Sequence, residues 1–218
     1  MKSEIFCNFN PNKIEEYMKK ILFLLILTIV IFNIKPMVAQ ENNMNNLNPN
    51  TALLIIDIQY FYFPDGAVPL VNPEKAALNA QHLLNYFREN KLPVIHVKHI
   101  AKSGAEIHEL VAPLEGEKVI AKQKANAFVG TDLLDHLKSK NIENLIICGM
   151  QTHMCVEAAT RAASDYGFNC TVVEDACTTR DLKFENITIK AEDVHFSTLS
   201  ALNGTYAKIL KTNDIVNK

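Results

Sequence analysis

The sequence predicts an α/β protein, with a single three-layer α/β/α domain built on a mostly parallel six-stranded sheet. Short continuous runs of Val, Ile and Leu alternate with longer stretches of helical periodicity, and such apolar runs are typical of strands buried on both faces. Strands separated by helices need crossover connections, which favour a parallel sheet covered by helices on both sides. The length of 218 residues suits one domain with a short extension.

The predicted elements follow one another along the chain. The first strand, 51–57, is a continuous apolar run that ends in an acid, and the first helix, 73–90, has apolar residues at helical spacing. The Ala-rich helix 155–166 stops at Gly167, which adopts a left-handed cap easily. By the same patterns the other predicted strands are 93–99, 118–121, 145–149, 169–174 and 206–210, and the other predicted helices are 131–140 and 190–202.

The N-terminal residues predict a secretory signal peptide, and therefore a secreted or periplasmic protein. Two lysines after Met18 precede the apolar run 21–32 and the small-residue stretch 38–40, the order found in such peptides. A membrane-spanning helix would need about 20 apolar residues, whereas Asn33 and Lys35 interrupt this run; an uncleaved anchor is the alternative. The expected organisation is an upstream extension at 1–17, a signal peptide at 18–40, a linker at 41–50, one domain at 51–210 and a C-terminal tail at 211–218.

Charge and cysteine usage narrow the expected partners. The net charge of −2 shows no basic excess, so neither nucleic acid nor an anionic membrane surface is expected as a partner. The five cysteines lack the paired C-x-x-C spacing of a zinc site and do not suggest a disulfide framework. No cofactor is expected.

Four reactive side chains follow the carboxyl ends of predicted strands, where functional groups collect in parallel sheets: Asp57, Lys122, Cys155 and Asp175. A carboxylate placed after an apolar run, as Asp57 is, would be costly to bury without a partner. Cys155 lies at the start of a helix, where free N–H groups and a nearby cation would lower the pKa of its thiol. Taken singly, each of the first three also fits a structural role: a cap for Asp57, a solvated loop position for Lys122 and inert packing for Cys155.

Longer motifs around these residues resemble the isochorismatase-like cysteine hydrolases, a superfamily of nicotinamidase-related amidohydrolases. The stretch 149–156, Gly-Met-Gln-Thr-His-Met-Cys-Val, resembles the signature G-x-x-T-x-x-C-V, and 54–59 is similar to the first-strand motif. Lys122 stands six positions before the Phe of 127–131, Ala-Phe-Val-Gly-Thr, which resembles the family's A-F-x-G-T element. Asp175-Ala176 is similar to the D-A after the fifth strand. The resemblance covers nearly the whole predicted domain.

The resemblance implies an amidase, a hydrolase acting on carbon–nitrogen bonds other than peptide bonds. It makes Cys155 the nucleophile, Asp57 the general base and Lys122 the group that stabilises the anions. A small-molecule amide would be cleaved through a thioester, with the oxyanion held by the backbone amides of Gln151 and Cys155. The resemblance also implies a cis peptide bond between Met150 and Gln151, and a homo-oligomer.

One departure from the family pattern bears on metal binding. Metal-dependent nicotinamidases resembling this chain carry a D-x-H element after the second strand, where this sequence has His99-Ile100-Ala101. No metal is therefore expected. His96 and His99 are three positions apart, so their side chains should diverge if the strand continues. A hydrogen-bonding or solvated role is expected for both of them and for His108.

Three further residues are candidates for substrate contact: Gln59, Phe128 and His153. Gln59 and Phe128 would supply the polar and apolar lining that small-molecule sites combine. His153 would either bond the substrate or lie at a subunit contact. The aromatic run 60–63 is expected to pack against a neighbouring subunit or the first helix.

The chemistry has alternatives that these residues leave open. The same nucleophile would serve a hydrolase of another acyl bond, an ester or a carbamate. Two hypotheses belong to different classes of protein: a catalytically silent binding protein on the same fold, and a redox protein that pairs Cys155 with Cys177. Arg180 follows the fifth strand and would either meet a substrate carboxylate or pair with an acid such as Asp181 or Glu185.

Overall fold

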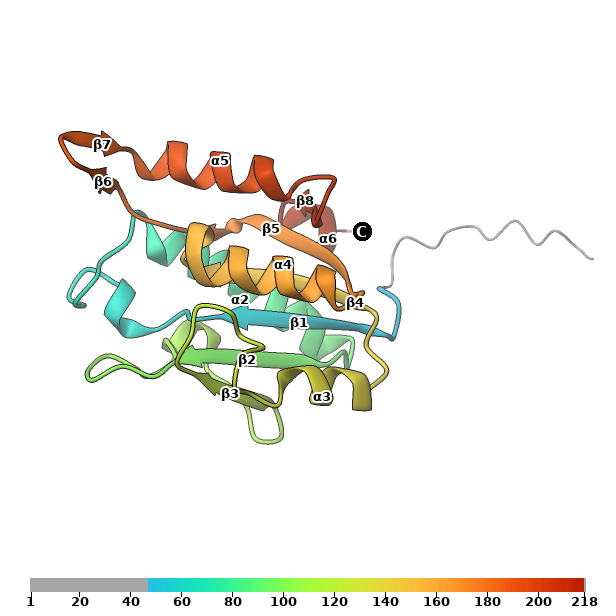
Figure 1. Ribbon diagram of the computed structural model, residues 1–218. Helices are drawn as coiled ribbons and strands as arrows, with labels where there is room; N and C mark the ends of the chain where they lie inside the picture. The colour runs from blue at the N-terminus through green and yellow to red at the C-terminus, as the bar shows by residue number, and fades with distance from the viewer. Residues whose placement is uncertain (1–46, 218) are drawn as a thin grey trace, which may run out of the picture. The chain divides into compact units, whose positions relative to one another are not determined.

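The computed structural model describes residues 47–217, so the predicted signal peptide lies outside the described residues. Six strands form one sheet in the order β3-β2-β1-β4-β5-β8, and every neighbouring pair is parallel (Figure 1). The predicted α/β class and six-stranded sheet are thereby confirmed. The strands are β1 (Thr51–Ile56), β2 (Val94–His99), β3 (Lys118–Lys122), β4 (Asn144–Met150), β5 (Asn169–Thr178) and β8 (Ala207–Leu210).

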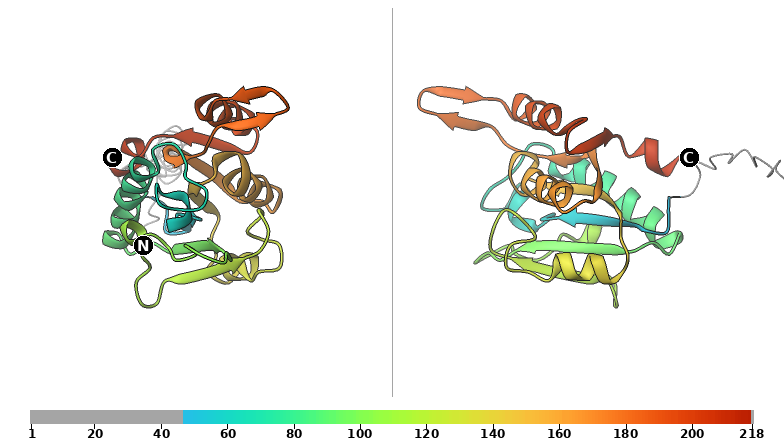
Figure 2. Two further views of the ribbon diagram at one scale, coloured as in Figure 1. Left: turned by 90° about the vertical axis from the view of Figure 1, so that its left-hand side faces the viewer. Right: turned by 45° about the vertical axis from the view of Figure 1, so that its right-hand side comes forward.

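Helices cover both faces of the sheet, which confirms the predicted three layers. One face carries α2 (Pro73–Glu89) and α6 (Asn213–Val216), and the other carries α3 (Leu133–Ser139), α4 (Glu157–Asp165) and α5 (Ala191–Leu202) (Figure 2). Short helical turns follow β1 as η1 (Tyr60–Tyr62), β2 as η2 (Glu109–Val111) and β4 as the π-helix η3 (Thr152–Val156). Over residues 47–217, none of the helices has the length and apolar character needed to cross a membrane.

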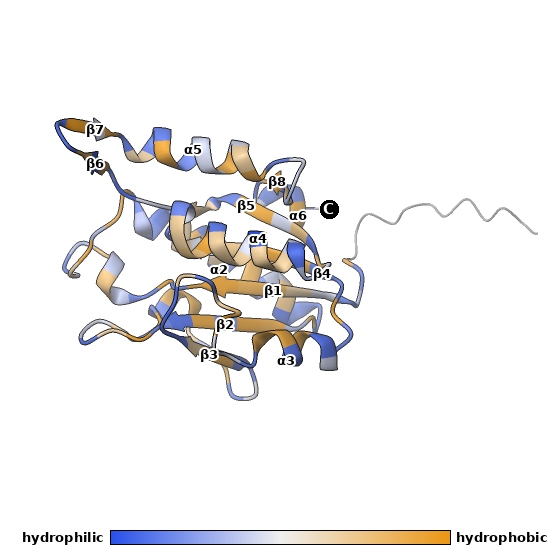
Figure 3. Cartoon of the chain, in the orientation of Figure 1, coloured by the Kyte–Doolittle hydropathy of each residue, from blue (hydrophilic) through white to orange (hydrophobic). Residues whose placement is uncertain are grey.

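The central strand β1 fixes where the ends of the neighbouring strands meet. It lies between β2 and β4, and all six of its residues are buried, in keeping with its apolar sequence (Figure 3). Ile56 pairs with Gly149 of β4, whose φ is 133°. A Cβ at Gly149 would clash with the backbone of Ile56, so only glycine lets the two strands approach this closely. The residues after β1 and β4 therefore emerge side by side.

The strand β5 is longer than the predicted strand 169–174 and continues to Thr178. Asp175 therefore does not end the strand, and the prediction that it presents a reactive group there is wrong. Its Oδ1 accepts hydrogen bonds from the backbone amide of Thr212 at 2.9 Å and from the hydroxyl of Thr212 at 2.8 Å. Asp175 thus fastens the C-terminal segment to the sheet.

Three local features differ from the predicted elements or add detail to them. The predicted helix 155–166 starts earlier, because η3 leads directly into α4. The peptide bond between Met150 and Gln151 is cis, as the resemblance implied. The strands β6 (Leu182–Phe184) and β7 (Ile187–Ile189) form a separate two-stranded sheet that was not predicted. Three-residue strands are too short for alternation to identify them.

A polar network holds the loop before β3 against α2 and β2. Glu117 accepts hydrogen bonds from Nε and Nη2 of Arg88, each at 2.8 Å, and lies 2.9 Å from Nε2 of His96. The backbone amide of Leu114 donates to the same carboxylate at 2.8 Å. Partial burial alone would raise the pKa of Glu117, but these hydrogen bonds lower it to about 2. His96 therefore has the hydrogen-bonding role expected of it.

This network predicts an acid-sensitive contribution to stability. Because its folded-state pKa is lowered, Glu117 stabilises the fold above its ordinary pKa, and this contribution is lost as the pH falls from about 4.5 toward 2. Glu117→Gln is expected to lower the free energy of unfolding at neutral pH by about 2 kcal/mol and to flatten that acid dependence. Urea denaturation across this range measures both. The exposed neighbour Glu115, changed to Gln, is the control, and equal effects of the two variants would contradict the assignment.

Candidate active site

Three elements bring Asp57, Lys122 and Cys155 together at the carboxyl edge of the sheet. Asp57 directly follows β1, Lys122 ends β3, and Cys155 lies in η3 after β4. Nζ of Lys122 donates to Oδ2 of Asp57 at 2.7 Å and to Sγ of Cys155 at 3.2 Å. The exposed fractions of Asp57, Lys122 and Cys155 are 0%, 1% and 5%. The three side chains that the motifs selected thus form one buried cluster.

The strand order explains why a lysine provides the cation. β3 lies two strands away from β1, with β2 between them, and Lys122 pairs in register with His99 at the end of β2. The flexible four-carbon stem of lysine carries its ammonium across the end of β2 as far as Asp57. Asp57 itself turns sharply, with a φ of 51°, and so leaves the strand toward this ammonium.

The electrostatics of the cluster place a proton on the sulfur in the resting state. Burial, and then the nearby Asp57 carboxylate, raise the pKa of the Cys155 thiol to about 12, and Lys122 lowers it only in part. The expectation of a lowered thiol pKa is therefore wrong, because desolvation outweighs the cation. Burial also raises the pKa of Asp57 above its ordinary value in spite of Lys122. The second oxygen of this carboxylate, Oδ1, is buried and has no hydrogen-bond partner among the described residues.

His99 joins the cluster, and Gln59 holds it in place. Nδ1 of His99 lies 3.3 Å from Nζ of Lys122. The amide of Gln59 donates to the carbonyl oxygens of His99 at 2.9 Å and Ala105 at 2.6 Å, and it accepts from the backbone N–H of His99 at 2.7 Å. Gln59 is fully buried. It fastens the end of β2 and the loop after it, rather than lining the pocket as expected.

A cavity of about 400 Å³ opens beside the sulfur. Cys155, His99 and Gln151 contribute to its wall, which is otherwise mostly apolar; the apolar lining includes Phe61, Tyr62, Val68, Ala125 and Met154. A cavity of this size suits a small molecule, since ligand pockets begin near 300 Å³. The cavity makes the sulfur a wall atom of a small-molecule pocket.

The family of the chain can be read from its match to known proteins. The model of the isochorismatase domain matches residues 51–204. The chain belongs to the isochorismatase family. It is 47% identical over 173 residues to the isochorismatase family protein YddQ of Bacillus subtilis (strain 168), a match that covers 74% of this chain and 96% of that protein.

The chain is also similar to a solved structure and to an enzyme of the isochorismatase family. A solved structure of a family protein from Oleispira antarctica is 41% identical, with a TM-score of 0.76, and covers 79% of this chain and 99% of that one. Maleamate amidohydrolase of Pseudomonas putida is 26% identical over 193 residues, covering 77% of this chain and 85% of that protein. The family resemblance stated from the motifs is confirmed.

Two other residues expected to contact substrate lie away from the cavity in this isochorismatase-family chain. The ring of Phe128 packs against Tyr166, with centroids 5.3 Å apart, and against Phe168 at 6.4 Å. Nδ1 of His153 lies 2.6 Å from the hydroxyl of Thr179. Neither Phe128 nor His153 lines the cavity beside Cys155, so the structure gives each a partner within the chain instead.

The aromatic run 60–63 supplies pocket residues that sequence reasoning missed. Phe61 and Tyr62 line the cavity, while Phe63 stacks on His108 with centroids 3.8 Å apart. The hydroxyl of Tyr62 accepts a hydrogen bond from Nε2 of Gln151 at 3.3 Å. The sequence did carry a sign of this role. The aromatic run directly follows Asp57, the candidate catalytic acid at the end of the first strand, so it lies at the same edge of the sheet as the pocket.

Arg180 pairs with neither of the acids proposed for it. Its Nε donates to Oε1 of Gln151 at 3.3 Å, whereas Asp181 bonds Lys190 at 2.9 Å. Gln151 therefore lies between the hydroxyl of Tyr62 and an exposed guanidinium. This arrangement brings a positive charge to the neighbourhood of the pocket.

The cysteines and the metal-ligand types in the described residues add two observations. All four described cysteines are buried and free of disulfides, and burial raises the pKa of Cys177 to about 12. Asp57, His99 and Cys155 place one potential ligand atom each within 4.8 Å of one another. Nζ of Lys122 lies within 3.3 Å of atoms in all three residues. The positive charge beside these three potential ligand atoms is therefore the ammonium group of Lys122.

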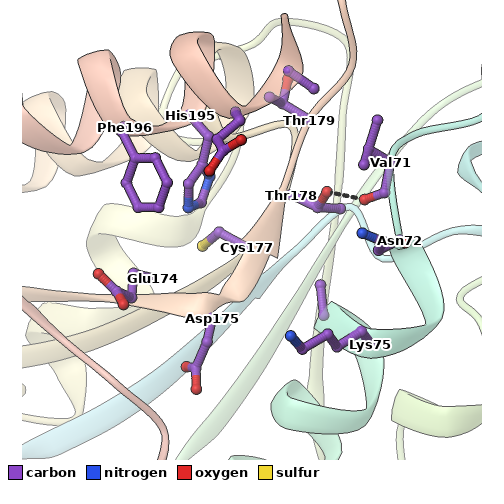
Figure 4. A pocket seen from close by; sticks show the side chains of 13 residues that line it. Val71, Asn72, Lys75, Glu174, Asp175, Cys177, Thr178, Thr179, His195 and Phe196 are labelled. Atoms are coloured by element: carbon purple, nitrogen blue, oxygen red, sulfur yellow. Dashed lines mark hydrogen bonds between the residues drawn. The ribbon is translucent and has the colours of Figure 1, made fainter.

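A second cavity, of about 430 Å³, lies between α2, α5 and β5 (Figure 4). Cys177, His195 and Glu174 are among its lining residues, and Asp57, Lys122 and Cys155 are not. Nδ1 of His195 lies 2.9 Å from the hydroxyl of Thr152 in η3. This cavity is therefore separate in its residues from the cluster around Cys155.

Proposed function

We propose that this chain is a cysteine-dependent amidase that cleaves a carbon–nitrogen bond of a small molecule through a thioester intermediate. The observation that carries the proposal is that one ammonium, Nζ of Lys122, bonds both the Asp57 carboxylate and the Cys155 sulfur beside a small-molecule cavity. The amide bond is proposed because an amidohydrolase is among the relatives of this chain.

The proposed first half-reaction transfers the acyl group to the sulfur. As Sγ of Cys155 attacks the amide carbon, its proton passes to Asp57, whose Oδ1 has no other hydrogen-bond partner among the described residues. The Lys122 ammonium stabilises the charge that shifts between thiol and carboxylate. The backbone amides of Gln151 and Cys155 are the proposed donors to the oxyanion, and one such donor is worth about 3–4 kcal/mol of barrier.

The first half-reaction ends when Asp57 returns its proton to the departing nitrogen, the C–N bond breaks, and ammonia or an amine leaves. The proposed second half-reaction restores the enzyme. Water then gives a proton to Asp57 and attacks the thioester carbon, and the C–S bond breaks as the sulfur regains that proton. The net reaction consumes one water and releases an acid and an amine.

An ammonia-release screen over small primary amides tests this proposal, run on the purified protein and on Cys155→Ala. Ammonia released by the wild type and not by the variant is the expected result. Matching esters and carbamates form parallel arms of the screen. Hydrolysis confined to those arms would replace the amide by another acyl bond, and no hydrolysis in any arm would favour a catalytically silent binding protein.

The pH dependence of the reaction is predicted by the buried carboxylate. Asp57 acts as a base only when it has lost its proton, and its pKa is raised above the ordinary 3.8. We expect kcat/KM to fall as the pH drops through a value above 3.8, while ultraviolet absorbance shows no Cys155 thiolate in the resting enzyme near neutral pH. A rate that stays level down to pH 3.8, or a thiolate present at neutral pH, would contradict this protonation pattern.

Association into a homo-oligomer, which the resemblance implies, stays a proposal for this chain. Export is a further proposal. The basic, apolar and small-residue order of residues 18–40 supports cleavage of a signal peptide. N-terminal sequencing of the protein from its native host should begin within 38–45. A protein that begins at Met1 or Met18 would sink the proposal.

A further inference from the structure

The ammonium of Lys122 has no N–H left for a substrate. A lysine ammonium carries three N–H donors and no lone pair. Nζ of Lys122 lies 2.7 Å from Oδ2 of Asp57, 3.2 Å from Sγ of Cys155 and 3.3 Å from Nδ1 of His99, so each donor has a partner within the chain. A side-chain hydrogen bond donated to a molecule beside the sulfur must therefore come from another residue of the cavity wall.

The contact with Lys122 determines which nitrogen of His99 carries the ring proton. Because an ammonium can only donate, Nδ1 of His99 accepts the hydrogen bond with its lone pair. In a neutral imidazole one nitrogen accepts and the other donates, and the hydrogen bond made by one fixes the role of the other. The proton of the His99 ring is therefore on Nε2.

This Nε2–H is an available donor in the wall of the cavity beside Cys155. His99 lines that cavity and is only partly buried, and its Nε2 has no hydrogen-bond partner among the described residues. One ring nitrogen of His99 lies within 4.8 Å of Sγ of Cys155. The imidazole therefore stands next to the atom that attacks the substrate.

The backbone on both sides of His99 is fixed, which sets the position of the ring in advance. The side chain of Gln59 accepts from the backbone N–H of His99 at 2.7 Å and donates to its carbonyl oxygen at 2.9 Å. The backbone amide of Ile100 donates to the carbonyl oxygen of Lys122 at 2.9 Å. A donor held in this way loses little conformational freedom when a ligand arrives.

The other polar side chains of the cavity wall differ from His99 in their surroundings. The amide of Gln151 is engaged by the hydroxyl of Tyr62 and by Nε of Arg180, each at 3.3 Å. Lys102 and Ser103 are exposed on the loop after β2, where water competes for their hydrogen bonds. The rest of the lining is mostly apolar, and in such pockets a few placed polar groups fix the orientation of the ligand.

We propose that His99 donates its Nε2–H to the substrate, and that the chain therefore selects amides that carry a hydrogen-bond acceptor close to the scissile carbonyl, on an otherwise apolar body. The proposal rests on the proposed function, which supplies the bond that reacts. The attacked carbon lies about 3–3.5 Å from the nucleophile in a reactive complex, and an acceptor lies about 2.9 Å from its N–H donor. Because sulfur and imidazole are neighbours, an ether or carbonyl oxygen next to the scissile carbonyl is the acceptor that this geometry favours.

Two amides that differ by one atom in the ring test this substrate class. Tetrahydrofuran-2-carboxamide and cyclopentanecarboxamide have rings of the same size, and only the first carries an oxygen beside the amide carbon. We expect the wild-type protein to prefer the ether amide by about three- to tenfold in kcat/KM, the scale of one neutral hydrogen bond. Division by the ratio of the two rates in alkaline hydrolysis removes the intrinsic difference in reactivity. Equal corrected values would overturn the proposal.

The variants His99→Asn and His99→Gln separate a substrate contact from a structural role. The side-chain oxygen of Asn can take the place of Nδ1 and still accept from Lys122, whereas the amide nitrogen of Gln can reach the place of Nε2 and still donate. We expect the Gln variant to keep the preference for the ether amide and the Asn variant to lose it. The reverse result would mean that His99 only holds Lys122. His82→Asn, at an exposed histidine of α2, is the control and should keep the preference.

Binding to Cys155→Ala tests the same contact without turnover. Isothermal titration of this variant should give a Kd for the ether amide about three- to tenfold lower than that for cyclopentanecarboxamide, and the difference should vanish in Cys155→Ala/His99→Asn. Equal affinities, or no binding of either amide, would overturn the proposal even where wild-type turnover supports an amidase. A difference in binding that depends on His99, with no turnover by the wild type, would instead contradict the proposed function.

Discussion

Replacement of Cys155 by alanine is expected to lower kcat/KM for any small amide that the enzyme hydrolyses by at least about a thousandfold, the scale seen when an attacking group is removed. Among the described residues, the sulfur is the one thiol or hydroxyl group that lies both in the cavity wall and within hydrogen-bond reach of Lys122. Without it, only direct attack by water remains. Ammonia release under kcat/KM conditions measures the loss.

A second thiol provides the control for that loss. Cys170 is also buried, and burial raises its pKa to about 12, but it bonds backbone carbonyls away from the cluster. Cys170→Ala should keep wild-type activity. Similar losses in Cys155→Ala and Cys170→Ala would show that buried thiols support the fold here and that Cys155 is not the nucleophile.

Replacement of Lys122 by methionine is expected to cost both activity and stability. Methionine has nearly the same length, so the change removes the ammonium and leaves the Asp57 carboxylate buried without its partner. Breaking a buried ion pair in this way costs about 3–5 kcal/mol of unfolding free energy. Lys118→Met removes a lysine from the same strand whose pair with Asp132 is exposed, and it should cost at most about 1 kcal/mol.

The double variant Asp57→Asn/Lys122→Met separates the two effects. It removes both charges, so it should recover most of the stability that Lys122→Met loses. Activity should stay as low as in the single variant, because the base is also gone. Urea denaturation and ammonia release on the same preparations give both quantities. Recovered activity in the double variant would show that the ion pair serves only the fold.

The sequence predicted the reactive cluster because parallel topology and local motifs agree on it. Asp57, Lys122 and Cys155 follow three strands whose carboxyl ends must lie at one sheet edge, and the structure brings their side chains into contact. The sheet was equally accessible, since the predicted apolar runs at 51–57, 93–99, 118–121, 145–149, 169–174 and 206–210 each fall on one of its six strands. The arrangement of the strands and of the side chains at their ends could therefore be predicted where burial determines the sequence pattern.

The direction of polar side chains was not predictable in the same way. Gln59 turns its amide onto the backbone of His99, and that depends on how the loop after β2 folds back rather than on residue type. The thiol pKa was misjudged for a related reason, because the balance between burial and Lys122 at Cys155 requires coordinates. Asp175 was misplaced since the end of a strand that continues by four residues leaves no local mark in the sequence.

Partition of the acyl group between water and hydroxylamine tests the central claim most directly. If acyl transfer to Cys155 precedes hydrolysis, hydroxylamine attacks the thioester, and the enzyme should release the hydroxamate of the substrate's acyl group in proportion to the hydroxylamine added. The Cys155→Ala variant provides the background to subtract. Release of the free acid alone, at any concentration of hydroxylamine, would mean that water attacks the amide directly and that no sulfur-bound intermediate forms.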